Sequence, residues 1–506
     1  MPQWTPLTRS ISLRQLFPKA KFFGADDIIV SSIAGDWQEV AEGDLFAALV
    51  GSRADGHHHV DDALRHGATA VLAERFVPTG GLPLCVVPDT RVAFARIAQA
   101  LVDNPSRRLK VIGVTGTSGK TTTSWLIRGI LEAAGHATGM LGTIELSDGQ
   151  WSSPSPETTP SAAVLAQWLS RMESVGCSHA VMEISSEALS QGRIEGIELH
   201  AACITNVRRN HLDIHNTLAN YRSAKAKIFS YLATDGFAVL NADDPVAASF
   251  ASAVTAPLLT AGMRAMAEVT AEVVDRSMSE QTFLLTAGCD TVAVRTRMIG
   301  DHHVSNCLIA ATTGLVWGFE LSEIARGLER VEKVPGRMER IECGQSFGVF
   351  VDYARTSDAL AAALDTLREV TPGRVICVFG AEGEQDRDQR PLLAAEVERQ
   401  SDLAVLTQTN PRCEPPTRIL RDVLRGFERP NIVEVIPDRT DAIGWALSQA
   451  EAGDCVLIAG RGHEEQQFVG NRRLAIDDRQ SARQWLYSHG LSTEMLVPAW
   501  QRQRAA

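Results

Sequence analysis

The chain has 506 residues, which at roughly 150 residues per domain suggests about three domains. Hydrophobic residues make up 44% and charged residues 22%, an ordinary globular composition that excludes a largely disordered chain. The formal net charge of −12 argues against a nucleic-acid-binding protein, because such proteins carry a basic surface.

The sequence shows no signal for export or for membrane insertion. Its first residues, MPQWTPLTRS, lack the apolar core of a secretory signal, and no run reaches 18 uninterrupted apolar residues. The nine cysteines are odd in number, scattered, and form no C-x-x-C pair. We therefore expect a cytoplasmic protein without a membrane span, whose thiols are reduced and buried.

The first 108 residues read as one unit. Short apolar runs (DLFAALV, TAVLAE, LCVV) alternate with the helical patterns VDDALRHGA and VAFARIAQALVDN. The polar segment NPSRRLK closes this unit and is typical of a linker.

From Val111 the pattern becomes strongly α/β. The apolar runs VIGV, AVMEI, ACITNV and FAVLN, and later VFVDYA, VICVFG, LAVLT and CVLIAG, are separated by helix-like segments. This alternation predicts parallel sheets covered on both faces. Residues 262–297 alternate instead and predict an antiparallel extension. PGR at 335–337 precedes the second series, so we expect domains at 109–334 and 335–506, with a poorly ordered tail from about 494.

Polar residues follow the predicted strands where each strand ends. In parallel sheets ligands gather at the carboxyl ends of the strands, so these positions are candidate site residues. They are GTSGKTT after VIGV, Glu183 after AVM, Asn206 at ACITNV, Asp352 after VFV, Gly380 after VICVF, TNPR after LAVL, and GRGHE after VLIA.

The segment VIGV-TGTSGKTTT-SWLIRGILEAAG is a strand, a glycine-rich loop and an amphipathic helix. Backbone N–H groups of such a loop face an anion, Lys120 would place a charge at the phosphates, and the Thr121 hydroxyl would hold Mg²⁺. Val114 occupies the first-glycine position of the strict pattern, so a turn that only resembles a phosphate loop is the alternative. The strand–loop–helix context favours nucleotide binding.

Other polar groups are ambiguous when each is taken alone. Glu183 could be a solvated loop carboxylate, and Lys225 and Lys227, in the helical pattern YRSAKAKIF, could be surface lysines. His211, Asp213 and His215 crowd into NHLDIH, where a metal or phosphate role and a structural role are about equally favoured.

Together these motifs resemble the Mur ligase family, specifically its MurE type (UDP-N-acetylmuramoyl-tripeptide synthetase), over nearly the whole chain. The resemblance begins with EGDLFAALVGSRADGHHHVDDALRHGA and includes, in the family's order, TGTSGKTTT, ETTP, MEISS, QGR, HLDIH, YRSAK, PGRMERI, DYARTSDAL, RPLL, TNPR, DRTDAI and GRGHE. It implies an α/β fold of three domains: a UDP-substrate-binding domain (1–108), a central P-loop ATPase built on a parallel sheet (109–334), and a Rossmann-like domain (335–506) that binds the added amino acid.

The resemblance also implies a reaction of peptidoglycan precursor synthesis. ATP and Mg²⁺ would convert a carboxylate of UDP-MurNAc-L-Ala-D-Glu into an acyl phosphate, which the amine of a diamino acid then attacks. The form N-P-R is associated with meso-diaminopimelate rather than L-lysine, because Arg412 can hold the additional carboxylate bidentately. We expect a monomer.

The family's functional residues transfer to this sequence in five sets. The implied catalytic residues are Lys120, Glu183, His211 and Lys225, and the implied metal ligands are Thr121, Glu183, His211 and a carbamylated Lys225. The implied ATP-binding residues are Thr115, Gly116, Thr117, Ser118, Gly119, Lys120, Thr121, Arg337, Asp352, Asp438 and Arg439. The implied UDP-substrate contacts are Ser52, Arg53, Ala54, Thr158, Thr159, Ser185, Gln191 and Arg193. The implied amino-acid pocket consists of Arg390, Thr409, Asn410, Pro411, Arg412, Gly460 and Glu464.

Several departures from the family fall inside these motifs. Relative to the family patterns, Glu187 replaces His, Asn210 replaces Asp, Ile214 replaces Tyr, Arg355 replaces His, Ser357 replaces Pro, Thr409 replaces Asp, and Arg461 replaces Lys. The family's N-T-T-P reads ETTP, its D-S-R reads Asp36-Trp37-Gln38, and its G-G-D-R-D-x-G-K-R-P is matched within 380–391 without the family Lys.

Three interpretations follow from these departures. The chain is a MurE-type enzyme with altered contacts, a divergent relative that uses another acceptor or binds nucleotide without turnover, or a folyl- or amino-acid-polymerising ligase. Because the phosphate loop, Glu183, His211, Lys225, Arg390, Asn410 and Arg412 survive together, we favour the first.

Overall fold

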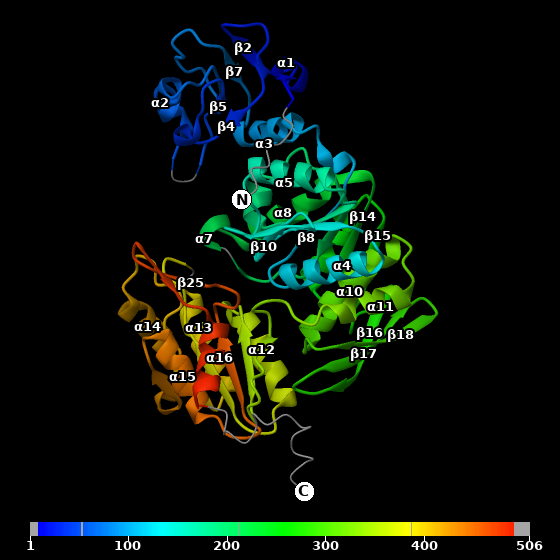
Figure 1. The fold of residues 1–506 in the computed structure, drawn as a ribbon, viewed down its shortest axis with the longest axis vertical. Helices are drawn as coiled ribbons and strands as arrows, with labels where there is room; N and C mark the ends of the chain where they lie inside the picture. Colours follow the sequence, from blue (N-terminus) through cyan, green and yellow to red (C-terminus); the bar gives the residue numbers. More distant parts are fainter. Residues whose placement is uncertain (1–8, 52–53, 211, 386, 490–506) are drawn as a thin grey trace, which may run out of the picture. The chain divides into compact units, whose positions relative to one another are not determined.

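The computed structural model describes residues 9–51, 54–210, 212–385 and 387–489 (Figure 1). These residues form two compact units. The first takes its residues from 1–116, 131–207 and 219–260, and the second from 117–130, 208–218 and 261–506. The domain limits expected near 108 and 334 stay predictions, and the tail from 494 lies outside the described residues.

The first unit opens with a five-stranded sheet in the order β2-β7-β6-β5-β4. Its strands are parallel except β2, and a separate pair, β1–β3, is antiparallel. The elements are β1 (Ile11–Ser12), α1 (Leu13–Leu16), β2 (Lys21–Phe23), β3 (Ile29–Val30), β4 (Ile33–Ala34), β5 (Leu45–Ala47), α2 (Val60–Arg65), β6 (Ala70–Ala73), β7 (Leu84–Val86) and α3 (Thr90–Leu101). The three apolar runs predicted in this region are therefore the strands β5, β6 and β7.

Both faces of this sheet are buried. On β6, Ala70 and Leu72 pack in the cluster that contains α3, whereas Val71 and Ala73 pack in the cluster that contains α2. Successive strand residues point to opposite faces, so burial on both sides explains the uninterrupted apolar runs.

The central strand of the next sheet, β8, lies between β12 and β13 and is parallel to both. In the first unit this sheet runs β11-β10-β9-β12-β8-β13-β14-β15. Its elements are β8 (Lys110–Thr115), β9 (Thr138–Leu141), β10 (Glu145–Ser147), β11 (Ser152–Pro154), α5 (Ala162–Ser174), β12 (His179–Glu183), α6 (Ser186–Ser190), β13 (Leu199–Ile204), α8 (Leu218–Ala226), β14 (Leu232–Asn241), α9 (Pro245–Ser249) and β15 (Leu258–Gly262). The strands β8, β12, β13 and β14 confirm the predicted parallel core.

The antiparallel extension predicted for 262–297 is confirmed. In the second unit Ala261, near the end of β15, pairs with Val269 of β16 (Val269–Arg276). Antiparallel pairing then joins β16 to β17 (Gln281–Ala287), and β17 to β18 (Asp290–Thr296). The helices of this part are α4 (Lys120–Ala133), α7 (Leu212–His215), α10 (Asp301–Val316) and α11 (Leu321–Arg330).

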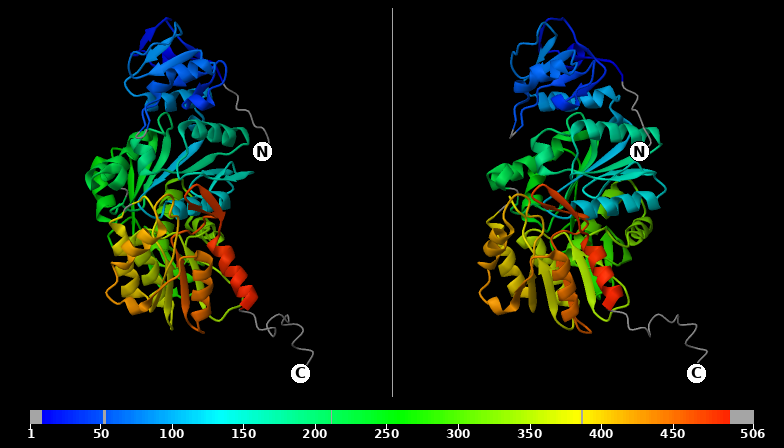
Figure 2. Two further views of the ribbon diagram at one scale, coloured as in Figure 1. Left: turned by 90° about the vertical axis from the view of Figure 1, so that its left-hand side faces the viewer. Right: turned by 60° about the vertical axis from the view of Figure 1, so that its left-hand side comes forward.

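The third sheet, in the order β19-β20-β24-β21-β22-β23, is parallel apart from β19. On β21, Ile376 and Val378 pack with α15 and α16, while Cys377 and Phe379 pack with α12, α13 and α14. Figure 2 shows these helices beside the sheet. The elements are β19 (Glu339–Arg340), β20 (Gly348–Asp352), α12 (Ser357–Val370), β21 (Val375–Phe379), α13 (Gln389–Gln400), β22 (Leu403–Leu406), α14 (Pro416–Leu424), β23 (Val433–Val435), α15 (Arg439–Gln449), β24 (Cys455–Ala459), β25 (Gln466–Val469), β26 (Arg472–Ala475) and α16 (Asp478–His489).

The cysteines are free, as predicted, but they are not all buried. Six are buried and Cys343 is partly exposed, whereas Cys289 and Cys413 are exposed. Cys289 and Cys413 lie between secondary-structure elements, where side chains are commonly exposed. Within the described ranges, no helix combines the length and apolar character needed to cross a bilayer.

Because His179 at the start of β12 is buried, we predict that it weakens the fold in acid. Burial lowers the pKa of His179 to about 4, and the charges of His136, Lys110 and His200 add to this effect. The unfolded chain takes up this proton near pH 6.5 but the folded chain does not, so stability falls as pH drops from 6.5 to 4.

A His179→Gln variant removes this titration. We expect its Tm to fall less between pH 7 and pH 5 than the wild-type Tm, by roughly 2 °C or more in differential scanning calorimetry. Parallel curves would contradict the assignment.

Candidate active site

The phosphate loop leaves β8 at Thr115 and enters α4 at Lys120, as the sequence predicts. Its first glycine cannot be replaced without a clash, because a Cβ on Gly116 would lie 1.9 Å from the Thr205 hydroxyl. The Thr205 N–H donates to the Thr115 carbonyl at 3.0 Å, which fixes the start of the loop against the end of β13.

The other end of the loop, in the second unit, packs against α10. Gly119 has φ +87°, and a Cβ there would lie 2.4 Å from Asn306 Oδ1. The Thr123 hydroxyl contacts that same oxygen at 3.2 Å, and the Lys120 ammonium donates to the Thr117 carbonyl at 3.3 Å. These approaches explain why the loop has glycine at this position.

Arg337, distant in sequence, reaches the beginning of α4. Its Nη2 donates to the Thr121 hydroxyl at 3.3 Å, and its guanidinium lies 4.3 Å from the centre of the Tyr353 ring. Asp352, also predicted to line the nucleotide, is held by the N–H groups of Met338 (2.7 Å) and Ala354 (2.8 Å). The structure thus brings Thr121 and Arg337 into contact.

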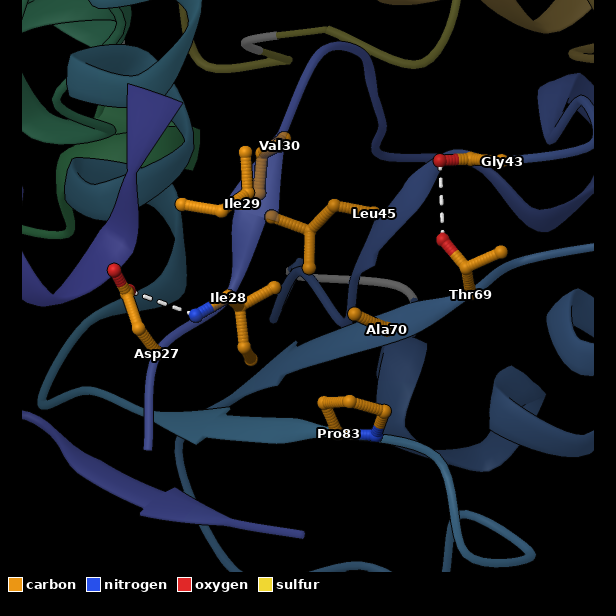
Figure 3. Close-up of a pocket in the computed structure, with 9 residues that line it drawn as sticks. All are labelled: Asp27, Ile28, Ile29, Val30, Gly43, Leu45, Thr69, Ala70 and Pro83. Carbon is orange, nitrogen blue, oxygen red and sulfur yellow. Dashed lines mark hydrogen bonds between the residues drawn. The ribbon is translucent and has the colours of Figure 1, made fainter. Parts of the chain in front are cut away.

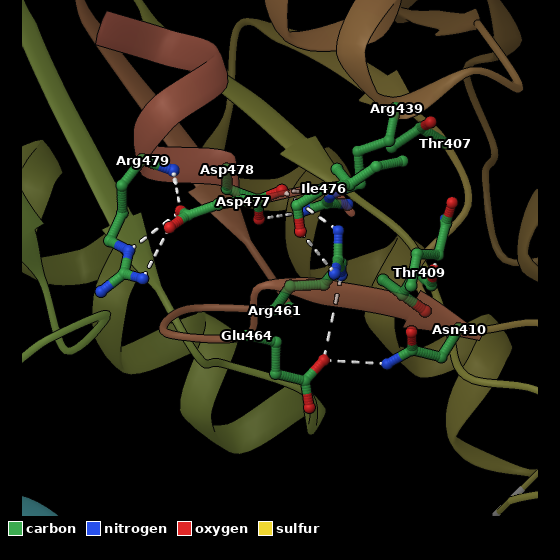
Figure 4. A network of polar contacts seen from close by, with 12 residues as sticks. Thr407, Thr409, Asn410, Arg439, Arg461, Glu464, Ile476, Asp477, Asp478 and Arg479 are labelled. Carbon is green, nitrogen blue, oxygen red and sulfur yellow. Dashed lines mark hydrogen bonds and ion pairs between the residues drawn. The ribbon is translucent and has the colours of Figure 1, made fainter. Parts of the chain in front are cut away.

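Asp438 and Arg439, the last predicted nucleotide residues, have visible structural roles. Asp438 accepts from the Asp441 N–H and caps α15. The fully buried Arg439 forms a bidentate pair with Asp478 at 2.9 and 2.7 Å (Figure 4). Arg461 also lies beside Asp478, at 3.7 Å, and burial lowers the pKa of its guanidinium.

Glu183, the last residue of β12, is buried and oriented by its neighbours. Its carboxylate accepts from the Thr143 N–H and hydroxyl, each at 2.9 Å, and the hydroxyls of Thr143 and Thr158 lie 3.1 Å apart. The Thr159 hydroxyl donates to the Glu183 carbonyl and accepts from the Ser185 N–H, both at 2.9 Å. Four of the predicted site residues therefore form one hydrogen-bonded cluster in the first unit.

Lys225 is not a surface lysine, so that alternative is wrong. Its side chain is buried, its Nζ donates to the Gly116 carbonyl at 2.8 Å, and it lies 4.8 Å from the centre of the Tyr221 ring. Lys227, two residues later, is exposed. Lys225 thus contacts the phosphate loop directly.

His211, a predicted metal ligand, lies outside the described residues, and His215 is buried. In the part of the chain that the structure describes, no three His, Cys, Asp or Glu side chains gather as a metal-binding group.

Arg193 is surrounded by two carboxylates that replace neutral or cationic residues of the family pattern. Its guanidinium pairs with Glu157, lies 3.4 Å from Glu187, and donates to the Thr159 carbonyl at 2.7 Å and to Gln191 Oε1 at 2.8 Å. Two departures thus meet at one predicted substrate contact. Of the remaining predicted contacts, Ser52 and Arg53 lie outside the described residues, and Ala54 is exposed.

The predicted amino-acid pocket gathers at the carboxyl ends of β21, β22 and β24. Asn410 donates from Nδ2 to Glu382 and to Glu464, both at 2.9 Å, and accepts from the Phe468 N–H at 3.1 Å. Arg355 pairs with the same two carboxylates and donates to the Gly460 carbonyl at 2.8 Å. Figure 4 shows Asn410 and Arg461 directed towards Glu464.

Arg390, assigned to the same pocket, is fully buried and bound by protein carboxylates. It forms a bidentate pair with Glu414 at 3.0 and 2.7 Å and donates to Asp422 at 3.0 Å. Hydrogen bonding from Arg390 lowers the pKa of Glu414 to about 2. Arg390 also donates to the backbone carbonyl of Glu382 at 3.0 Å. This hydrogen bond links Arg390 to the predicted pocket.

Several departures contact one another in the loops and helix starts that follow β20 and β21. Arg355 pairs with Glu382, and the Ser357 hydroxyl lies 3.1 Å from Gln389 Oε1, where Gln389 stands in place of the family lysine. Such reciprocal contacts are typical of substitutions that compensate each other.

Five residues that contact the predicted site residues were not predicted from the sequence. They are Thr143, Tyr353, Glu382, Glu414 and Asp478. Tyr353 and Glu382 lie inside the motifs, but the resemblance implies no role for either. Glu414 and Asp478 follow no predicted strand, and pairing between such distant residues leaves no local signal.

One cavity of about 180 Å³ lies beside the first sheet (Figure 3). It contains none of the residues predicted for the UDP-substrate, which places it outside the candidate site. The lining residues are Asp27, Ile28, Ile29, Val30, Gly43, Leu45, Thr69, Ala70 and Pro83.

Comparison with known proteins identifies the family. The Mur ligase middle domain matches residues 114–314, and the Mur ligase glutamate ligase domain matches residues 336–462. A relative from Geobacillus kaustophilus, named UDP-N-acetylmuramoyl-L-alanyl-D-glutamate–2,6-diaminopimelate ligase, is 41% identical over 467 residues, which cover 91% of this chain and 95% of the relative. The chain belongs to the Mur ligase family.

Solved structures agree with this family assignment. A 2,6-diaminopimelate ligase of the same name is 30% identical with a TM-score of 0.67, covering 96% of this chain and 100% of that chain. The MurF ligase from Thermotoga maritima, solved in complex with ADP, is 19% identical with a TM-score of 0.62, covers 85% and 94%, and shares the fold. The expected three-domain Mur ligase architecture is thereby confirmed for this Mur ligase.

We predict that Gly119→Ala weakens ADP binding at least about tenfold, because the new Cβ meets Asn306 Oδ1 and the left-handed φ is strained. Gly135→Ala is the matched control, since Gly135 has a similar φ of +84° but no atom within 4 Å of the added Cβ. Titration calorimetry with ADP measures both variants. If both variants bound ADP equally weakly, the strained backbone φ, and not the contact with Asn306, would be responsible.

Proposed function

We propose that this Mur ligase joins meso-diaminopimelate to UDP-MurNAc-L-Ala-D-Glu in an ATP-dependent, ADP-forming reaction of peptidoglycan precursor synthesis, acting as a cytoplasmic monomer. The observation that carries the proposal is the end-to-end similarity to the 2,6-diaminopimelate ligase of Geobacillus kaustophilus. The clustering of Asn410, Glu464 and Glu382 beside Arg412 supports it, because a diamino acid with two carboxylates needs both anionic and cationic partners.

Phosphoryl transfer requires that two negatively charged groups, the acceptor carboxylate and the γ-phosphate, be brought together. In the proposed reaction the carboxylate oxygen attacks the γ-phosphorus and ADP leaves. The free amine of the amino acid then attacks the acyl carbon, and phosphate departs from the tetrahedral intermediate. The proposed roles of Lys120 and Arg337 are to hold the phosphates as fixed cations.

Mg²⁺ fits the chemistry of the proposed ligands, since it prefers carboxylate and hydroxyl oxygens and usually shares phosphates with them. Glu183 would supply an oriented carboxylate, Thr121 a hydroxyl, and Lys225 a carbamate oxygen, with His211 as a further ligand. The ion would neutralise phosphate charge when bound.

The acceptor would lie against Thr158, Thr159, Ser185, Gln191 and Arg193, with Ser52, Arg53 and Ala54 on the uridine side. Five of these residues belong to the Glu183 and Arg193 hydrogen-bond networks, which supports a shared role. The added amino acid would lie against Arg390, Thr409, Asn410, Pro411, Arg412, Gly460 and Glu464.

The proposal is tested by phosphate release from ATP with Mg²⁺, UDP-MurNAc-L-Ala-D-Glu and a panel of amino acids. We expect release with meso-diaminopimelate and at least about tenfold lower kcat/KM with L-lysine, which lacks the second carboxylate. Lys120→Ala is the control for contaminating activity and should abolish release. Absence of substrate-dependent release with every amino acid would refute the proposal.

We further predict that Lys225 is carbamylated in the active enzyme. Carbamylation turns a buried cation into an anion, so Lys225→Arg should lose turnover as fully as Lys225→Ala, although arginine keeps the charge. Protein equilibrated with ¹³C-bicarbonate should show a carbamate signal in the NMR spectrum, and the Lys225→Arg variant should lack it. Substantial turnover in Lys225→Arg would contradict carbamylation.

A further inference from the structure

Glu382, on the loop after β21, is a buried carboxylate with one unsatisfied oxygen. Its side chain is 7% exposed. Oε1 lies 3.1 Å from Arg355 Nη1 and accepts from Asn410 Nδ2 at 2.9 Å. Oε2 receives no hydrogen bond from any described residue.

The cation paired with this oxygen, Arg412, does not hydrogen-bond to it. Arg412 Nη2 lies 3.7 Å from Oε2, outside hydrogen-bonding distance, and the Arg412 side chain is 41% exposed. A buried acceptor without a partner costs about 1–3 kcal/mol, and more when it is charged, so its retention requires a compensating partner.

The neighbouring carboxylate, Glu464, is already engaged. Its Oε1 pairs with Arg355 Nη2, and its Oε2 accepts from Asn410 at 2.9 Å. Both oxygens of Glu464 therefore have a partner. Glu382 Oε2 has no hydrogen-bond donor among the described residues.

The positions of the departures indicate that a carboxylate has moved. Counted back from Arg390-Pro391, Glu382 stands at the first glycine of the family's G-G-D-R-D-x-G-K-R-P, while Thr409 stands where the family has aspartate. The two sites are adjacent, since the Thr409 hydroxyl donates to the carbonyl of Ala381 at 2.6 Å. One carboxylate is lost at 409 and one is gained at 382.

Arg355, which replaces a histidine of the family pattern, holds the relocated carboxylate. Burial works against its charge, but Glu382 and Glu464 hold the Arg355 pKa above its usual value. Its guanidinium also lies 4.1 Å from the centre of the Tyr353 ring. Arg355 can therefore fix Oε1 of Glu382 while Oε2 points to another partner.

We propose that Glu382 is a substrate-binding residue whose Oε2 accepts a hydrogen bond from the ammonium group of the diamino acid that is not acylated, and that Arg355 is its positioning residue. The inference rests on the proposed function. It adds a specificity determinant at a position where the family pattern has no side chain.

The test compares diaminopimelate with 2-aminopimelate, which keeps both carboxylates but lacks the second ammonium. Glu382→Gln should lower kcat/KM for diaminopimelate about 10–100-fold, mainly through KM, because a charged hydrogen bond is lost. The value for 2-aminopimelate and the KM for ATP should change by less than about threefold. Equal losses for both amino acids would show that Glu382 is only structural and would overturn the proposal.

Glu384→Gln is the matched control, because Glu384 lies on the same loop, is exposed, and binds the Cys413 N–H through an oxygen that glutamine retains. It should preserve the preference for diaminopimelate. For Arg355, the Arg355→Gln variant should lose this preference and Arg355→Lys should partly restore it. An unchanged preference in Arg355→Gln would remove Arg355 from the proposal.

Calorimetric titration of the full-length protein with diaminopimelate in the presence of ADP separates this inference from the proposed function. Binding that weakens at least about tenfold in Glu382→Gln, without turnover in wild type, would support the inference and refute the ligase assignment. Binding that is equal in both proteins would overturn the inference alone, and no binding in wild type would overturn both.

Discussion

The candidate site depends on the burial of parallel strands on both faces. A strand such as β21, covered by α12–α14 on one side and by α15 and α16 on the other, can carry only apolar side chains along its length. Polar groups are therefore restricted to the positions where strands end. Glu183 is the last residue of β12, and Asp352 is the last residue of β20.

The same constraint explains how far the sequence predicts this structure. Apolar runs separated by helical patterns indicate the sheets, and the antiparallel extension is visible from the alternation of residues 262–297. Local patterns also place the phosphate loop, because its strand, glycines and helix are contiguous. They do not reveal that Arg337 lies on Thr121, since that contact joins residues 216 positions apart.

Ionic partners were the least predictable part of the site. Glu414 and Asp478 lie outside the recognised motifs, yet they form bidentate pairs with the buried Arg390 and Arg439. A buried guanidinium without such a carboxylate would be strongly destabilising, so the partner is as necessary as the arginine itself. The sequence shows which arginines belong to motifs, but only the fold shows what satisfies them.

The reciprocal contacts of Arg355 with Glu382 constrain how this Mur ligase diverged. Gaining Glu382 alone would bury a carboxylate that only Asn410 could hydrogen-bond, whereas Arg355 gained alone would still pair with Glu464. Only the change that introduces Glu382 first would leave a buried charge without its cation. The order of the two changes therefore matters, and an evolutionary path from the family pattern to this sequence is favoured when Arg355 appears before Glu382.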